Sequence, residues 1–326
     1  MASLRERASL NWMVGKDEDE AVQDCVGLQE EAWLLGQPGL NSFLDHMTET
    51  VVGDVAPSRA ALVDEWRKAN DHYYDLEIKE AGIADQVEIL DLPPVLAPHS
   101  AEIMADSSYQ RAFDVLPTRF AMVQLERLVS SQRHVNLSHV RRLRSRLSPS
   151  PALEELFRFC FPLERSELKV RMRPSGRNRF TICSESSDFR FHEAVMFQPE
   201  QIMGYAAKGA VGGIIGLVVG FGSNFVCGVQ SDSRVLLHNG HHRAYALLEH
   251  GITHAPCIIE TVTRKEELSL VARSRVLEAA AFYFKAARPP LLKDFLDPRT
   301  RKVVTVPRQV HMIDVSFEVQ DYTADG

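Results

Sequence analysis

Cysteine is scarce in this chain of 326 residues, and no two cysteines have the C-x-x-C spacing of a metal site or a redox pair. The five thiols are scattered and odd in number, which excludes the disulfide framework of a small secreted domain. The N-terminus has no pattern of a signal peptide. We therefore expect reduced, mostly buried thiols in a cytoplasmic protein.

Positive charge is also in short supply. The chain has 37 Lys and Arg against 44 Asp and Glu, a formal net charge of −7. Because a protein that wraps nucleic acid neutralises phosphates with an excess of cations, this balance disfavours nucleic acid as a partner of the whole chain. Local basic patches remain compatible with it.

An uninterrupted apolar run suited to a membrane helix is missing as well. The one candidate, residues 209–229, is free of charge but contains seven glycines. Glycine at that density penalises a helix and suits close-packed strands and tight turns. We therefore predict two buried strands, at about 214–219 and 225–229, and no membrane segment.

A hydrophobic content of 45% is enough for a full core. Helical spacing of apolar residues runs from about 20 to 82 and includes a helix start at Ser58. Prolines at 93, 94 and 98 interrupt it, and Ser100 is predicted to cap a further short helix. The sequence thus predicts a helical N-terminal region over residues 1–112, followed by an α+β domain over 113–326.

The second region mixes strand and helix patterns. A hairpin at 167–183 requires antiparallel pairing, whereas strand, helix and strand at 234–262 have the size of a βαβ unit. Asn136 or Ser138 is expected to cap a helix that begins at 137. The predicted strands are 120–125, 167–173, 179–183, 189–197, 234–237, 256–262 and 303–319, and the predicted helices are 137–147, 153–159, 243–249 and 264–286.

The densest chemistry lies where a strand ends and a helix begins, at Asn239, Gly240, His241, His242 and Arg243. The first N–H groups of a helix have no internal partners and, with the positive end of the helix dipole, favour an anion. Glycine permits close approach of a phosphate, and an arginine can bind it bidentately. Either histidine is a candidate to donate to the phosphate or to move a proton near neutral pH.

A structural interpretation competes with this one. Asn-Gly is a common turn, and two histidines in a first helical turn often only cap and pack. The other histidines have no H-E-x-x-H pattern, so no metal site is predicted. Arginines at 141, 142, 144 and 146 are candidates for phosphate contact, although such a face is more often simply solvated.

The run 235–248 resembles the signature of the superfamily that contains the N-terminal domain of ParB-type partition proteins and sulfiredoxin. There a strand precedes a Gly-x-x-Arg phosphate corner and a helix. The run 122–147 is similar too, with a strand, a loop containing Arg133 and His134, and a helix. The resemblance implies a ParB/sulfiredoxin-like mixed-sheet core that binds nucleotide phosphates, with Arg133 and His134 closing the side opposite the corner.

Departures from the family pattern limit the activity that is implied. Sulfiredoxin has its catalytic cysteine where this chain has His241, so repair of sulfinic acid is not expected. Partition proteins have Glu-Arg in place of His241-His242 and a basic helix-turn-helix, which is not evident here. The family also includes nucleotide-dependent kinases of small molecules. Such phosphoryl transfer requires Mg²⁺ and a carboxylate base, for which Glu126 is the candidate by position.

These observations predict a protein that binds a nucleotide or another phosphate-bearing ligand at Asn239–Arg243. Whether it acts as a phosphotransferase or nucleotide hydrolase, with His241, His242 and Glu126 as catalytic residues, stays open at this point. The alternative is a non-catalytic regulatory or DNA-associated ParB-like module. A third interpretation has the corner as vestigial and the helical region as an interaction scaffold.

Overall fold

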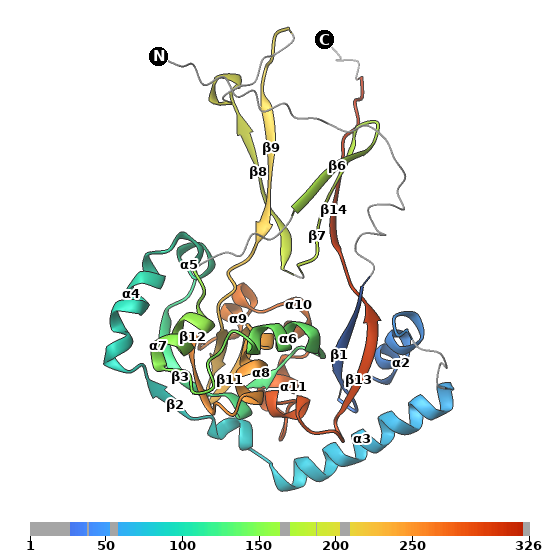
Figure 1. Cartoon of the computed structure of the whole chain (residues 1–326), viewed down its shortest axis with the longest axis vertical. Coiled ribbons are helices and arrows are strands. Elements are labelled where there is room, and N and C mark those ends of the chain that lie inside the picture. The colour runs from blue at the N-terminus through green and yellow to red at the C-terminus, as the bar shows by residue number, and fades with distance from the viewer. Residues whose placement is uncertain are drawn as a thin grey trace. The chain divides into compact units, whose positions relative to one another are not determined.

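The computed structural model describes residues 27–37, 39–52, 58–163, 170–186, 188–202 and 209–321. The predicted helical pattern before residue 27 and Cys25 lie outside these residues. The chain forms two compact units. Unit 1 comprises Met1–Gly27, Glu167–Phe221 and Arg308–Gly326, and unit 2 comprises Leu28–Ser166 and Gly222–Pro307. Helices and strands are interleaved in an α+β arrangement with several sheets, which confirms the coarse fold class (Figure 1).

Unit 2 is built on two sheets. A six-stranded mixed sheet has the order β2-β3-β12-β10-β11-β4, and a three-stranded sheet has the order β13-β1-β5. The strands are β1 (Leu28–Leu34), β2 (Ile89–Asp91), β3 (Thr118–Gln124), β4 (Val129–Ser130), β5 (His134–Asn136), β10 (Cys227–Ser231), β11 (Arg234–Asn239), β12 (His254–Val262) and β13 (Arg301–Pro307).

The helices of unit 2 lie between these strands in the sequence. The α-helices are α2 (Leu40–Glu49), α3 (Arg59–Lys79), α4 (Ala97–Ala105), α5 (Ser107–Ala112), α6 (Leu137–Arg144), α7 (Leu153–Cys160), α8 (His241–Glu249), α9 (Lys265–Val271), α10 (Ser274–Glu278) and α11 (Ala280–Lys285). Short 3₁₀ turns are η1 (Ile83–Gln86), η2 (Pro94–Leu96), η3 (Leu125–Arg127) and η5 (Leu292–Phe295).

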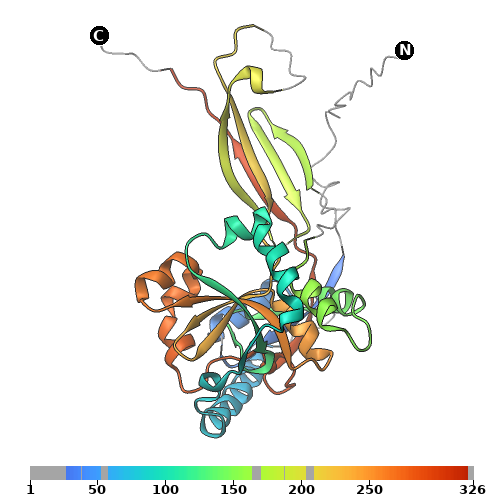
Figure 2. The ribbon, with the colours of Figure 1, turned by 90° about the vertical axis from the view of Figure 1, so that its left-hand side faces the viewer.

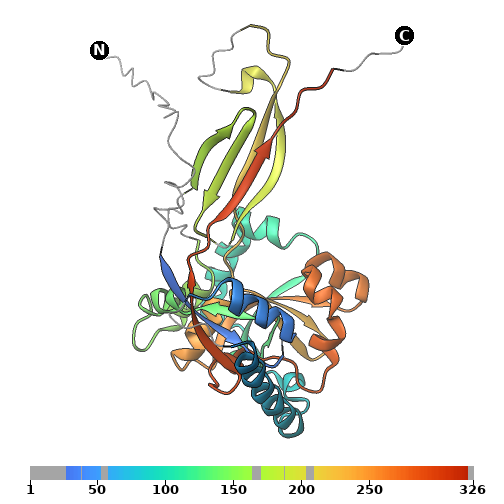
Figure 3. The ribbon, with the colours of Figure 1, turned by 90° about the vertical axis from the view of Figure 1, so that its right-hand side faces the viewer.

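The helix expected through residues 28–34 is wrong, because this segment is strand β1 between β13 and β5. Its apolar side chains point to both faces of the sheet. Ala32 and Leu34 join the main core, whereas Trp33 joins a second core under α2 and α3. A strand that is buried on both faces has no period-2 alternation, so its spacing resembles that of a helix. The predicted helices after it are present as α2 and α3 (Figure 3). Ser58 caps α3 by accepting from the N–H of Ala61.

Two further helix predictions need correction. Ser100 caps nothing, because α4 already begins at Ala97 with Pro98 in its first turn. Asp106 caps the next helix instead by accepting from the N–H of Ser108 at 2.7 Å. The single helix expected at 264–286 is three short helices, α9 to α11 (Figure 2, orange).

The predicted βαβ unit is wrong in its direction. Strand β10 lies between β11 and β12, pairing antiparallel with β11 and parallel with β12, so β11 and β12 run in opposite directions. The cause is a tight turn with Asp232 at a positive φ of 52°, which folds β11 back along β10 before α8 begins. Helix α8 then packs into the main core through Ala244, Tyr245 and Leu247.

Unit 1 contains a three-stranded sheet of order β14-β7-β6 and a two-stranded sheet of β8 and β9. Its strands are β6 (Val170–Gly176), β7 (Arg179–Ser184), β8 (Phe189–Phe197), β9 (Ile214–Phe221) and β14 (His311–Ser316), and η4 (Pro199–Gln201) follows β8. The hairpin turn falls at Asn178, where it was predicted, with φ 62°. Strand β9 exists as predicted, but Ile215 and Leu217 are exposed rather than buried. Within the residues that the structure describes, no helix is both long and apolar enough to cross a membrane.

Candidate functional site

The predicted corner has the expected backbone. Strand β11 ends at Asn239, Gly240 is the N-cap of α8 in the left-handed region (φ 80°), and His241, His242 and Arg243 form the first turn. No side chain caps this helix, whose first internal hydrogen bond runs from Ala244 N to the carbonyl of Gly240 at 2.9 Å. The start of α8 therefore presents backbone N–H groups and a positive dipole end.

Arg243 is held inside the protein. Its side chain is only 8% exposed, and its Nη1 donates to the Asn224 carbonyl at 2.8 Å and to the Asn224 side-chain oxygen. Asn239 Nδ2 donates to the carbonyl of Ser223 at 2.6 Å. Both ends of the corner are thus bonded to the loop before β10, which fixes the guanidinium beside the helix start.

His242 joins the first turn of α8 to the first turn of α6. Its Nε2 accepts from the N–H of Asn136 at 3.0 Å, while the Asn136 side chain caps α6 by accepting from His139 N at 2.8 Å, which confirms that predicted cap. The rings of His139 and His242 meet edge to face, with centroids 5.2 Å apart. Two helix N-termini, each a weak anion attractor, are therefore neighbours.

Burial keeps these imidazoles neutral. Burial, with a smaller contribution from neighbouring groups, lowers the pKa of His242 to about 3 and that of His139 to about 4. For His242 these groups are His139, His134 and Arg243. For His139 they are the cations Arg142, Arg243 and Arg146. Because Nε2 of His242 accepts a hydrogen bond, its neutral ring carries the proton on Nδ1. Neither ring acts as an imidazolium donor at neutral pH in the unliganded chain.

The four arginines of the α6 segment divide into two pairs. Arg141 forms an ion pair with Glu30, and Arg144 forms one with Glu249 at 2.8 Å. Arg142 and Arg146 form no ion pair with a carboxylate in the described ranges, and both add positive potential at His139. Arg142 lies in the second turn of α6, and Arg146 follows just after the end of that helix at Arg144. Arg142 and Arg146 are therefore available to an outside anion as far as the described carboxylates are concerned.

His241 lies deepest in the corner. It is 6% exposed, and its Nε2 is buried with no hydrogen-bond partner in the part of the chain that the structure covers. Burial is the main cause that lowers the pKa of His241 well below the usual range. Interactions with His242, Arg273 and His238 act in the same direction. An unsatisfied buried ring nitrogen costs free energy unless something outside this set of residues completes it.

The structure does not bring Glu126 to the corner. Leu125 N donates to the carbonyl of Thr253 at 2.9 Å, so Glu126 lies beside the C-terminal end of α8. Nine helical residues separate that end from the corner by about 13 Å. The Glu126 carboxylate accepts from Gln124 Nε2 at 2.9 Å.

Arg133 and His134 occupy two different environments. His134 stacks on Trp33 with a centroid distance of 5.0 Å and lies close enough to lower the pKa of His242. Arg133 lines a separate cavity that contains none of the residues Asn239–Arg243. Of the two, only His134 thus belongs to the surroundings of the corner.

The thiols are consistent with an unreactive role. Cys160, Cys227 and Cys257 are free and buried, and Cys183 is half-buried. Burial raises the pKa of Cys160 to about 12 and that of the other two buried thiols as well. Since the thiolate is the reactive form, these three cysteines are inert at neutral pH.

Sequence reasoning missed a buried carboxylate in the large sheet. Glu260 lies on β12 opposite Val229 of β10, is 4% exposed, and receives no hydrogen bond from the residues described. Burial alone raises its pKa to about 7. In the sequence, only the apolar residues around Glu260 in the predicted strand indicate that this carboxylate is buried.

We expect Glu260→Gln to stabilise the protein at alkaline pH. Because the folded pKa is raised, the folded state binds this proton more tightly, and stability is lost as pH rises from 4.5 through 7. At about 1.4 kcal/mol per pKa unit, the gain at pH 8 is about 3 kcal/mol, with little difference at pH 4. Urea unfolding of both proteins at the two pH values measures this difference, and an equal effect at both would contradict it.

No group of three or more His, Cys, Asp or Glu side chains within the described ranges is arranged to hold a metal ion. No protein-family model matches the chain, and neither the curated proteins nor the solved structures contain a significant match. The resemblance to the partition-protein and sulfiredoxin superfamily stays a prediction from the motif residues.

Proposed function

We propose that unit 2 binds a nucleotide or another phosphate-bearing ligand between the first turns of α6 and α8. The observation that carries the proposal is the hydrogen bond from Asn136 N to His242 Nε2, which joins the two helix starts, together with Arg142 and Arg146, which have no described carboxylate partner. Helix N-termini and guanidinium groups are the groups that proteins use most for phosphate.

Each group has a distinct part in this proposal. Arg142, on α6, and Arg146, just after its end, supply two forked donors whose charges both reach His139. Arg243 supplies a fixed positive charge beside the start of α8. His139 and His242 serve as neutral ring donors and packing groups. A phosphate dianion would offset the positive potential that these side chains share.

Phosphoryl transfer or nucleotide hydrolysis receives less support from the same geometry. Glu126, the candidate base, lies at the opposite end of α8, and the corner residues are cationic or neutral. A Mg²⁺ ion would therefore arrive with the nucleotide phosphates rather than be held by carboxylates of this site. The proposal is accordingly one of binding, in a ParB/sulfiredoxin-like core as the sequence resemblance implies.

We expect Arg142→Gln to weaken binding of a nucleoside triphosphate by about 10- to 100-fold, the loss of a charge-assisted hydrogen bond of about 1.5–3 kcal/mol. Titration calorimetry with and without Mg²⁺ measures it. The matched control is Arg141→Gln, next to it on the same helix but paired with Glu30. Equal losses in both variants, or no binding by the wild type, would sink the proposal.

Arg243→Ala is a less specific test than the sequence alone suggested. The sequence predicts a loss of about 2–4 kcal/mol in binding with the fold retained. Since Arg243 also bonds Asn224, its removal loosens the loop before β10 in the unliganded protein. The α6 arginines avoid this ambiguity.

A non-catalytic, nucleic-acid-associated role is the second candidate, and one feature of unit 1 favours it. The β6–β7 hairpin has four arginines, at 171, 173, 177 and 179, and none forms an ion pair with a carboxylate in the described ranges. Some proteins read DNA with the strands of a β-sheet placed in a groove, and β6 and β7 belong to such a sheet. Salt-dependent binding of duplex DNA without any response to nucleotides would favour this candidate.

A further inference from the structure

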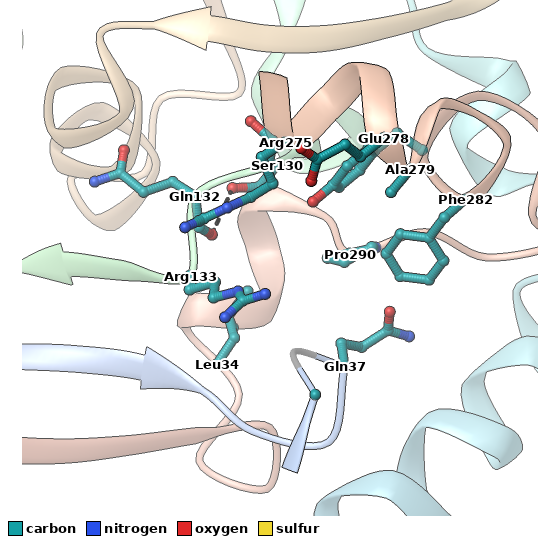
Figure 4. A pocket seen from close by; sticks show the side chains of 13 residues that line it. Leu34, Gln37, Ser130, Gln132, Arg133, Arg275, Glu278, Ala279, Phe282 and Pro290 are labelled. Atoms are coloured by element: carbon teal, nitrogen blue, oxygen red, sulfur yellow. Dashed lines mark hydrogen bonds between the residues drawn. The ribbon is translucent and has the colours of Figure 1, made fainter. Parts of the chain in front are cut away.

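A cavity of about 310 Å³ lies in unit 2 away from the corner. Its polar lining comes from Arg133 and Ser130 before β5, from Gln37 after β1 and from Arg275 on α10. Figure 4 shows the two arginine side chains reaching into the same space from different elements. The cavity brings together segments more than 200 residues apart in the sequence.

The two guanidinium groups lie in one cavity, and neither forms an ion pair with a described carboxylate. Burial lowers the pKa of Arg133, and the charge of Arg275 lowers it further. Glu278 lines the same cavity, yet no salt bridge joins it or any other described carboxylate to either arginine. The partial burial of Arg133 next to a second positive charge costs free energy that a bound anion would offset. A dianion matches two cations best.

The rest of the lining is mostly apolar. Ala279, Phe282 and Pro290 form a wall across from Arg133, and Leu34 lies beside that arginine (Figure 4). Gln37 contributes a buried Oε1 with no hydrogen-bond partner among the described residues. Ligand sites have this composition, with an apolar wall and a few convergent polar groups. The volume is at the low end of the usual range of about 300–1,000 Å³, which suits one ring and one charged head.

We propose that this cavity is a second ligand site, which takes a phosphate monoester of a small aromatic compound. Arg133 and Arg275 bind the phosphate, and the ring packs against Phe282 and Pro290. The site is independent of the corner, because none of Asn239–Arg243 lines it. The proposal for this cavity is therefore tested independently of nucleotide binding between α6 and α8.

The test uses phenyl phosphate as the probe on the full chain, with titration calorimetry. The wild type is expected to bind phenyl phosphate at least fivefold more tightly than inorganic phosphate, and phenol not measurably. Arg275→Gln, at an exposed position, should lose at least tenfold in affinity. Arg142→Gln, the variant that tests the corner, should leave this affinity unchanged.

A second variant keeps both charges and removes the space. Ala279→Leu fills the cavity beside the apolar wall and should also abolish binding of phenyl phosphate, with circular dichroism showing a retained fold. Wild-type affinity in Arg275→Gln, or no binding by the wild type at millimolar probe, overturns the proposal. Loss in Arg142→Gln but not in Arg275→Gln would assign the probe to the corner and overturn it as well.

Discussion

Replacing Gly240 by alanine is expected to lower the free energy of unfolding by about 2–5 kcal/mol. A residue with a Cβ pays about 1–2 kcal/mol in the left-handed region that Gly240 occupies, where φ is 80°. The new Cβ would lie 2.8 Å from Val226 Cα, which belongs to the backbone and cannot rotate away. Overpacking of this kind adds about 1–3 kcal/mol. Urea unfolding followed by circular dichroism measures the sum.

Gly251, just after α8, is the matched control. It has a φ of 90°, but a Cβ there would meet nothing within 4 Å. Gly251→Ala should therefore cost only the conformational part, about 1–2 kcal/mol. If both variants lose the same stability, the contact with Val226 is not what requires glycine at position 240. From the sequence, glycine was expected here for a turn and for the close approach of a phosphate. In the structure, the group that approaches Gly240 closely is Val226.

Local rules were enough for much of the fold. Asn136 and Ser58 cap helices where their side-chain chemistry predicts, and Gly240 precedes a helix after a buried strand. The predictions failed where tertiary contacts determine the secondary structure or the strand pairing. Strand β1 is buried on both faces, so its spacing had no strand signature, and the order of β10, β11 and β12 depends on a turn at Asp232. Sequence pattern gives element type more readily than strand pairing.

The candidate site could be predicted only in part, for the same reason. The Gly240–Arg243 corner is contiguous in sequence, so its geometry followed from a strand, a turn and a helix. The sequence did not show which of the four arginines at 141, 142, 144 and 146 form ion pairs. Arg141 and Arg144 pair with Glu30 and Glu249, and each partner is more than 100 residues away. The pairing of Arg133 with Arg275 across a cavity is equally non-local. Charge neutralisation is a tertiary property that no local motif encodes.

The other large effect is expected at the buried ion pair beneath α3. Arg288 is 1% exposed and binds Asp294, itself 3% exposed, through two hydrogen bonds of 2.5 and 2.6 Å. Asp294 also accepts from Tyr73 Oη of α3 at 3.2 Å and from Leu291 N at 2.8 Å. Asp294→Asn should lower the free energy of unfolding by about 3–5 kcal/mol, because it leaves a buried guanidinium without its closest counter-charge. Thermal and urea unfolding at pH 7 measure the loss.

Two comparisons separate this charge effect from a loss of shape. Glu80→Gln removes the second carboxylate that Arg288 binds, at 3.0 Å. Because Glu80 is partly solvated, this substitution should lower the free energy of unfolding by only about 1 kcal/mol. The double variant Arg288→Met/Asp294→Leu removes both buried charges and should recover most of the stability that Asp294→Asn loses. If the double variant is no more stable than Asp294→Asn, then packing or the lost acceptor for Tyr73 Oη and Leu291 N, rather than the unpaired charge, determines the cost. In that case the network would hold α3 in place by geometry alone.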